Sequence, residues 1–334
     1  MENQTLQRCE LLMENRGCIK SVFFWESGLI HLACAGIYGA KDIPVDIYRL
    51  EECKELLKNR VSVFSNFRGN IRPAVASMMA TSQNMETSLE EGLRLYELLK
   101  KDFWSSEYLV LAAMVIEKLA KPEDYGKIAA RTRRIYELMK AEHPFLISGE
   151  DSVFCALLAV SEKEDRQLID EMEQCYHILK KYFFSNDAVQ SLCQVLALCG
   201  NAPEKKCERV LELYDCMKKA GCKYGTRNEL PTLGIMALAQ GSAEQKTRLI
   251  CEIDGWLARQ RGFGALGSIS RKQRLMYAAV LAGREFHLGE DDHPVLQTAA
   301  VSGVLSAIIA QEAAMCAAVG ASIAASAAAS SASS

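Results

Sequence analysis

Apolar residues recur along most of the chain at steps of three and four, which is the spacing of one stripe on an α-helix. Leu89, Leu93, Tyr96 and Leu99 form one such stripe, and similar stripes occupy 128–139, 168–179 and 207–217. A second segment, apolar on more than one face and rich in alanine, follows each stripe after a short linker. Because such a segment needs cover on several sides, the pattern predicts paired helices whose second members form a central layer.

A five-residue motif, Tyr-x-x-apolar-Lys, lies at the end of the first helix in four successive pairs. The copies begin at Tyr96, Tyr136, Tyr176 and Tyr214, about 40 residues apart, and weaker copies begin at Cys9, Lys54 and Gly255. The lysine falls in the last helical turn, where a cation complements the helix dipole, and its stem can pack on the tyrosine ring. The motif therefore predicts seven helical hairpins.

These hairpins define the expected fold class, which is all-α. A period near 40 residues matches HEAT and armadillo repeats and exceeds the tetratricopeptide and ankyrin periods, so we expect antiparallel hairpins stacked as an α-solenoid. Residues 1–292 are assigned to the repeats, 293–325 to Ala-rich capping helices and 326–334 to a frayed Ala/Ser tail. Self-association and membrane contact remain alternatives for this C-terminal region.

Hydroxyl residues in the linkers are candidates for the starts of the second helices. They are Ser105, Ser148, Ser185 and Thr226. The segment that begins at Thr226 has the spacing of a capping box, and the one that begins at Ser148 resembles it. We expect no strands, because the short apolar runs 22–25 and 61–64 fall where a first helix passes to a second.

Charge and cysteine content bear on partners and location. The net charge of −3, with no interleaving of basic and aromatic residues, argues against nucleic-acid binding. The polar start lacks the apolar segment of a signal peptide, and cysteines such as Cys34, Cys155, Cys193 and Cys251 lie in apolar runs. We therefore expect a cytoplasmic protein with reduced, buried cysteines and no membrane span.

A glycine-rich turn precedes the second helix of the last hairpin. Gly262-Phe-Gly264-Ala-Leu-Gly267 matches the dinucleotide fingerprint literally, but it follows a helix instead of a strand, so we expect no cofactor. Its backbone N–H groups, together with Arg271, Lys272 and Arg274, can hold an anion. The alternative is a solvated basic turn.

A second basic turn, Phe67-Arg68-Gly-Asn70-Ile-Arg72-Pro73, occupies the same position in the second hairpin. It is also explained simply as a helix start, with proline in the first turn. If both turns face one groove, the candidate ligand-binding residues are Arg68, Asn70, Arg72, Gly262, Gly264, Arg271, Lys272 and Arg274.

No catalytic or metal motif is evident. The acidic stretch between His287 and His293 lacks the spacing of a helical zinc site and is interpreted as a charged linker. No Walker loop, nucleophile elbow or zinc-protease motif occurs, so we expect no catalytic residues, metal or cofactor.

Several stretches resemble a bacterial family known as domain of unknown function family 4003. They are Phe64–Asn70, Gly262–Gly267, Arg274–Ala279 and the Ala/Ser-rich end. The resemblance implies a helical protein of the bacterial cytosol and carries over no activity. Stacked hairpins build extended surfaces, so we expect a binding or scaffold protein for a peptide or protein. The alternative is a protein or enzyme that takes a small anion at the basic glycine turns.

Overall fold

The computed structural model describes residues 1–263 and 267–286, and these residues form fourteen α-helices, three short 3-10 helices and no strand. The α-helices are α1 (Asn3–Val22), α2 (Gly28–Gly39), α3 (Ile47–Arg60), α4 (Arg72–Ala80), α5 (Met85–Leu99), α6 (Glu107–Leu119), α7 (Tyr125–Glu142), α8 (Ser152–Val160), α9 (Asp165–Leu179), α10 (Asn186–Ala197), α11 (Pro203–Lys219), α12 (Leu230–Leu238), α13 (Ala243–Leu257) and α14 (Arg271–Ala282). The 3-10 helices are η1 (Asn66–Arg68), η2 (Pro122–Asp124) and η3 (Gly149–Asp151). The all-α prediction is confirmed.

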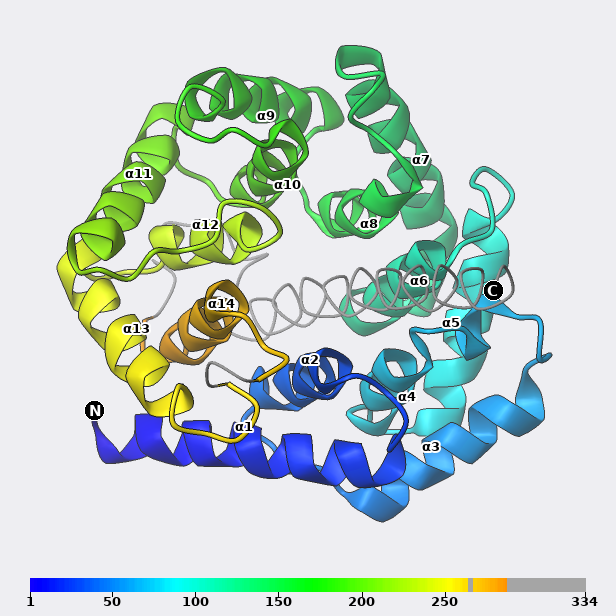
Figure 1. Cartoon of the computed structure of the whole chain (residues 1–334). Helices are drawn as coiled ribbons and strands as arrows, with labels where there is room; N and C mark the ends of the chain where they lie inside the picture. Colours follow the sequence, from blue (N-terminus) through cyan, green and yellow to red (C-terminus); the bar gives the residue numbers. More distant parts are fainter. Residues whose placement is uncertain (264–266, 287–334) are drawn as a thin grey trace, which may run out of the picture.

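The helices form two concentric layers, with odd-numbered helices outside and even-numbered helices inside (Figure 1). Each outer helix packs on the next outer helix and on its own inner partner, and each inner helix packs on the next inner helix. Outer helices bury one stripe, such as Leu168, Met172 and Leu179 of α9. Inner helices are buried on all sides: in α12, every residue from Leu230 to Leu238 is buried. This difference explains the two kinds of hydrophobic pattern.

The stack of hairpins closes on itself, because α14 contacts both α1 and α2. Arg8 of α1 donates to the Glu285 carboxylate at 2.5 Å and to Asp42 at 3.3 Å. Arg284 also donates to Asp42, at 2.9 Å. The hairpins therefore form a ring, a closure that the prediction of a stacked α-solenoid did not include. The predicted capping helices and tail, 293–334, lie outside the described residues.

The tyrosine of the repeat motif marks the contact between neighbouring hairpins. Its ring meets an aromatic side chain of the preceding linker edge-on or at a tilt, with centroids 4.6 to 5.4 Å apart. The pairs are Phe67–Tyr96, Phe103–Tyr136, His143–Tyr176 and Phe183–Tyr214. The motif lysines Lys100, Lys140 and Lys180 lie over the same tyrosine rings, with Nζ 5.3 to 5.7 Å from the centroids. The motif recurs because each copy makes the same contact between hairpins.

The described parts of the linkers from outer to inner helices lie on one side of the ring, which we call the linker face (Figure 1). Contacts join successive linkers: Asn66 donates to Ser105 at 2.7 Å, and Arg271 donates to the Gly221 carbonyl at 2.9 Å. Since every hairpin has the same orientation, the N-termini of the inner helices all point to this face. Ser185 caps α10 and Ser148 forms the predicted type of capping box with Asp151.

Two predicted helix starts are wrong. Ser106, and not Ser105, accepts from the backbone of α6, whereas the Ser105 hydroxyl pairs with that of Tyr96 at 2.6 Å. Helix α12 begins at Leu230, beyond Thr226, because Glu229 accepts a hydrogen bond from the backbone of Arg227 and forms a local turn.

The opposite side of the ring, where inner helices return to outer ones, is called the return face. Here buried or partly buried cations of the outer helices donate hydrogen bonds to carbonyl groups at the ends of inner helices. Lys206 donates to the Leu196 carbonyl at 2.9 Å, Lys246 to the Ala239 carbonyl at 2.5 Å, and Arg131 to the Ala159 carbonyl at 3.0 Å. These contacts replace the hydrogen bonds that the last helical carbonyls lack.

The cysteine prediction is correct for Cys34, Cys155 and Cys193, which are buried free thiols. Burial raises the pKa of Cys34 to about 12 and that of Cys155 well above its usual value. The prediction is wrong for Cys251, which forms a disulfide with Cys222 and so ties the α11–α12 linker to α13. The sequence did not reveal this pair because the two residues belong to different hairpins.

Candidate functional site

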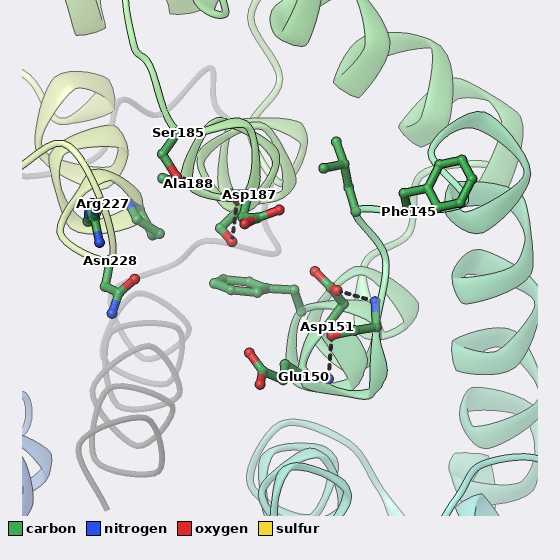
Figure 2. A pocket seen from close by; sticks show the side chains of 13 residues that line it. Phe145, Glu150, Asp151, Ser185, Asp187, Ala188, Arg227 and Asn228 are labelled. Carbon is green, nitrogen blue, oxygen red and sulfur yellow. Dashed lines mark hydrogen bonds between the residues drawn. The ribbon is translucent and has the colours of Figure 1, made fainter. Parts of the chain in front are cut away.

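A pocket of about 430 Å³ opens on the linker face between the starts of α8, α10 and α12. Three linkers supply its walls, so the pocket depends on the stacking of three hairpins. In Figure 2, Arg227 and Asn228 lie on the α12 side, opposite Glu150 and Asp151 at the start of α8. Asp187 of α10 lies between these two groups. Phe154 contributes an apolar surface.

Asp151 is held firmly in the pocket wall. The backbone N–H of Ser148 donates to Asp151 Oδ2 at 2.9 Å, and Gln194 Nε2 of α10 donates to Oδ1, also at 2.9 Å. Burial raises the pKa of the Asp151 carboxyl, and the negative charges of Glu150 and Asp187 act in the same direction. The two hydrogen bonds oppose this change. The pocket therefore brings together three carboxyl groups from the start of α8 and from α10, and a cation among them would relieve their repulsion.

The pocket also offers a donor wall. Arg227 and Asn228 are exposed at the turn before α12, on the side opposite Glu150 and Asp151. A guanidinium group and an amide can bind a carboxylate or a carbonyl oxygen. The arrangement of carboxylates, an aromatic surface and donors fits a ligand that has both a cationic and an oxygen-bearing group.

The predicted basic turn of the second hairpin lies on the linker face, but its polar groups already have protein partners. Arg68 donates to the carbonyls of Lys58 at 3.0 Å and Val61 at 3.2 Å. The Asn70 backbone N–H donates to Glu107 at 2.7 Å, which joins this linker to the next inner helix.

Arg72, at the start of α4, is the third predicted residue of this turn. Its guanidinium lies 3.6 Å from the Glu26 carboxylate and over the Phe23 ring, 5.8 Å from the centroid. Arg72 thus connects the second hairpin to the first.

The predicted glycine turn of the last hairpin is also engaged in contacts. Arg274 pairs with Asp254 at 2.6 Å and donates to the Phe263 carbonyl at 2.8 Å. Arg271 holds the Gly221 carbonyl, while Lys272 is exposed. Gly262 adopts φ +94°, a conformation that favours glycine. Gly264 lies outside the described residues.

The two basic turns do not meet. They share the linker face, but the α1–α2 hairpin separates them, because α2 packs against both α14 and α4. Neither turn lines the pocket.

Sequence reasoning missed the pocket and five exposed aromatic side chains on the same face. The aromatic residues are Trp25, Phe64, Trp104, Phe145 and Phe184, which are 93% to 102% exposed. A signal was present, because an aromatic residue follows each motif tyrosine by eight or nine positions at Trp104, Phe145 and Phe184. The pocket residues had a weaker signal, since Ser148 and Asp151 were visible only as a capping pattern.

Two other kinds of feature are metal-ligand clusters and membrane-spanning helices. Over 1–263 and 267–286, no group of three or more His, Cys, Asp or Glu side chains is arranged to hold a metal ion. Within the same ranges, no helix has both the length and the apolar character needed to cross a membrane. The His287–His293 stretch, interpreted as a charged linker, lies outside the described residues.

The fold places this protein in the class of closed rings built from stacked helical hairpins, with a pocket on one face. A family model described as "protein of unknown function (DUF4003)" matches residues 17–313, and the chain belongs to this family. The resemblance seen in the sequence is therefore confirmed. No curated protein and no solved structure matches the chain.

Proposed function

We propose that the protein is a binding module that holds a segment of a peptide or protein partner in the pocket on the linker face. The observation that carries this proposal is the opposition of acidic and donor groups across the pocket, with Glu150 and Asp151 opposite Arg227 and Asn228 and with Asp187 between them. A basic side chain fits against the carboxylates, and a carboxylate or carbonyl group fits against the donors. Phe154 supports the apolar stem of the basic side chain.

The size of the pocket agrees with a single side chain and adjoining peptide groups. Typical small-molecule sites measure about 300–1,000 Å³, and the pocket of about 430 Å³ lies near the lower end. The pocket is open to solvent on the linker face. A longer partner chain can therefore lie across it without passing through the ring. The cytoplasm is the location we propose for this encounter, in keeping with the buried free thiols of Cys34, Cys155 and Cys193; the Cys222–Cys251 disulfide is the exception.

Selection from a displayed library of random peptides tests this proposal. We expect the selected peptides to be enriched in Lys or Arg and to bind the wild-type chain. The double variant Glu150→Gln/Asp187→Asn should bind them at least about tenfold more weakly, since a charge-assisted hydrogen bond contributes about 1.5–3 kcal/mol. Asp215→Asn, an exposed carboxylate on α11 away from the pocket, is the matched control. Selection of no basic peptides, or equal binding by the double variant, would refute the proposal.

The alternative, a small anion bound by the basic glycine turns, remains a second proposal with less support. Arg68, Arg72, Arg271 and Arg274 have carbonyl or carboxylate partners, and an incoming anion would have to compete with these contacts. Lys272 is exposed beside Arg271. Titration with inorganic phosphate, followed by calorimetry, tests this alternative. Binding that is lost in Arg271→Ala/Lys272→Ala would favour it over the peptide site.

A further inference from the structure

Five aromatic side chains project from the linker face, one from each of the first five linkers. We call this set the aromatic crown, and it consists of Trp25, Phe64, Trp104, Phe145 and Phe184. Each is at least 93% exposed. The linkers also contain buried apolar side chains, such as Phe103 next to Trp104 and Phe183 next to Phe184. The buried residue packs the hairpins together, so the exposed neighbour is not needed for the fold.

An exposed aromatic residue at the same place in five consecutive hairpins is unusual for a surface that meets only water. Single exposed apolar residues are common on protein surfaces, whereas groups of them mark places where a partner or a membrane binds. The crown residues come from the linkers of five successive hairpins, so they are distributed along one side of the ring. This distribution differs from the packed apolar centre of a protein–protein interface.

Lysine residues accompany the crown with the same period. The last turn or C-cap of each of the first six outer helices carries an exposed lysine on this face: Lys20, Lys58, Lys100, Lys140, Lys180 and Lys218. Further exposed lysines, Lys101, Lys181, Lys219 and Lys223, lie beside them.

The segments that form the linker face carry more basic than acidic residues, although the chain as a whole has a net negative charge. Just before two of these segments, Glu55 and Glu97 pair with Lys58 and Lys100 at 3.0 and 3.1 Å. Lys and Arg outnumber Asp and Glu by more than two to one over residues 20–30, 58–75, 100–110, 140–154, 180–189, 218–232, 259–263 and 267–274, yet the whole chain has a net charge of −3. Three of the few acidic residues in these segments, Glu150, Asp151 and Asp187, line the pocket. The rim of the face is therefore more basic than the average over the segments.

We propose that the linker face docks on the surface of an anionic phospholipid bilayer, with the aromatic crown inserted at the level of the headgroups. Aromatic rings are favoured at the membrane–water interface, and lysines near an anionic leaflet each add to the attraction. A flat fluid surface accepts separate projecting rings without a complementary shape. Several weak anchors acting together suit reversible binding.

This inference goes beyond the proposed function and does not depend on it, although Phe145 of the crown also lines the pocket. Membrane docking depends on the crown and the rim lysines, whereas peptide binding depends on the pocket carboxylates and Arg227. Both features lie on the linker face, so a docked ring would hold its bound peptide segment next to the headgroups. The variants that test the two proposals share no residue.

Vesicle binding with tryptophan fluorescence tests the docking. The chain has three tryptophans, of which Trp25 and Trp104 belong to the crown and Trp256 lies partly buried on α13. In a Trp256→Phe background, emission comes from the crown alone. We expect a blue shift and co-sedimentation with vesicles of phosphatidylcholine that contain one third phosphatidylglycerol. Pure phosphatidylcholine vesicles should give neither, and added salt should weaken the binding.

The variant Trp25→Ser/Phe64→Ser/Trp104→Ser, made in the otherwise wild-type chain, shows whether the crown carries the binding. We expect its vesicle affinity to fall at least about tenfold, since burial of a large aromatic side chain contributes strongly to transfer from water. Circular dichroism should remain unchanged because the three side chains are exposed. Tyr48→Ser is the matched control, as Tyr48 is 81% exposed in the first turn of α3, on the return face.

Three outcomes would overturn the proposal. They are no binding to the anionic vesicles, equal binding to the neutral ones, and unchanged binding by the triple variant. Loss of vesicle binding in Tyr48→Ser to the same extent would also overturn it, since the contact would not depend on the linker face. Recovery of a protein partner that requires the crown, without any vesicle binding, would assign the face to a protein interface instead.

Discussion

The contact between Phe103 and Tyr136 tests whether the motif tyrosine couples neighbouring hairpins. The two rings meet nearly edge-on, with centroids 5.2 Å apart and an interplanar angle of 70°. Phe103 is 9% exposed and Tyr136 8%, so solvent screens the pair little. The guanidinium of Arg133 lies over both rings, 5.3 and 5.4 Å from their centroids. Replacing either ring with leucine keeps an apolar side chain but removes the aromatic geometry.

The expected magnitude follows from these contacts. An aromatic pair of this geometry contributes about 0.5–1.5 kcal/mol beyond the buried area. Each single substitution also loses packing and a cation–π contact, so Phe103→Leu and Tyr136→Leu should each lower the free energy of unfolding by about 1–3 kcal/mol. The double variant should cost less than the sum. We expect a coupling energy of about 0.5–1.5 kcal/mol, which a double-mutant cycle isolates from the other losses.

Urea unfolding of the wild type, both single variants and the double variant, followed by circular dichroism and by fluorescence, measures this coupling. Coincident transitions from the two probes are required before the free energies are compared. The control cycle pairs Phe103 with Tyr214, which lies three hairpins further along the chain and packs against Phe183. That cycle should give a coupling within about 0.5 kcal/mol of zero. A Phe103–Tyr136 coupling no larger than the control would show that the recurrent contact does not couple the hairpins.

Three further predictions concern ring closure, backbone conformation and pH. Arg8→Ala should lower the free energy of unfolding in urea by about 1–3 kcal/mol, because two part-buried contacts with carboxylates are lost; an unchanged value would show that closure adds no stability. Gly262→Ala should cost about 1–2 kcal/mol from its φ of +94°, whereas Gly255→Ala, exposed on α13, should be neutral or stabilising. Burial lowers the pKa of Lys246 from 10.5 to about 8, so the unfolded chain binds the proton more tightly between these values. The free energy of unfolding should therefore rise with pH across that window, and Lys246→Met should reduce the rise. Urea unfolding at pH 8 and pH 10 measures it, and an equal rise in the wild type and the variant would contradict this prediction.

The sequence predicted the hairpins because the contacts that define them repeat locally. Tyr96, Tyr136, Tyr176 and Tyr214 each pack on the preceding linker, so the same residue is required every 40 residues or so. Closure of the ring was not predictable in this way. It depends on the curvature that accumulates over seven hairpins, and Arg8 meets Glu285 across 277 positions of the chain. One such contact produces no periodic pattern.

The candidate surfaces were harder to predict, because hydrophobicity does not distinguish a buried aromatic residue from an exposed neighbour. Phe103 and Trp104 are adjacent in the sequence, yet one is 9% exposed and the other 95%. The basic turns were candidates for an anion site because they combine cations and glycines. In the structure, however, Arg68 and Arg274 donate hydrogen bonds to backbone carbonyl groups of their own chain. The carbonyl groups approach these arginines only when the linkers fold, so the sequence alone does not predict the contacts.

The repeat also explains how the two faces acquired different characters. In every hairpin the outer helix ends, and the inner helix begins, at the linker face, so lysines favoured by the outer-helix dipole gather there. On the return face, cations such as Lys206 are buried against carbonyl groups and add no accessible charge. One exposed aromatic residue in one linker would have little effect on binding. Repetition places five of them on an arc around the same basic face, and only then can weak contacts add to a useful affinity.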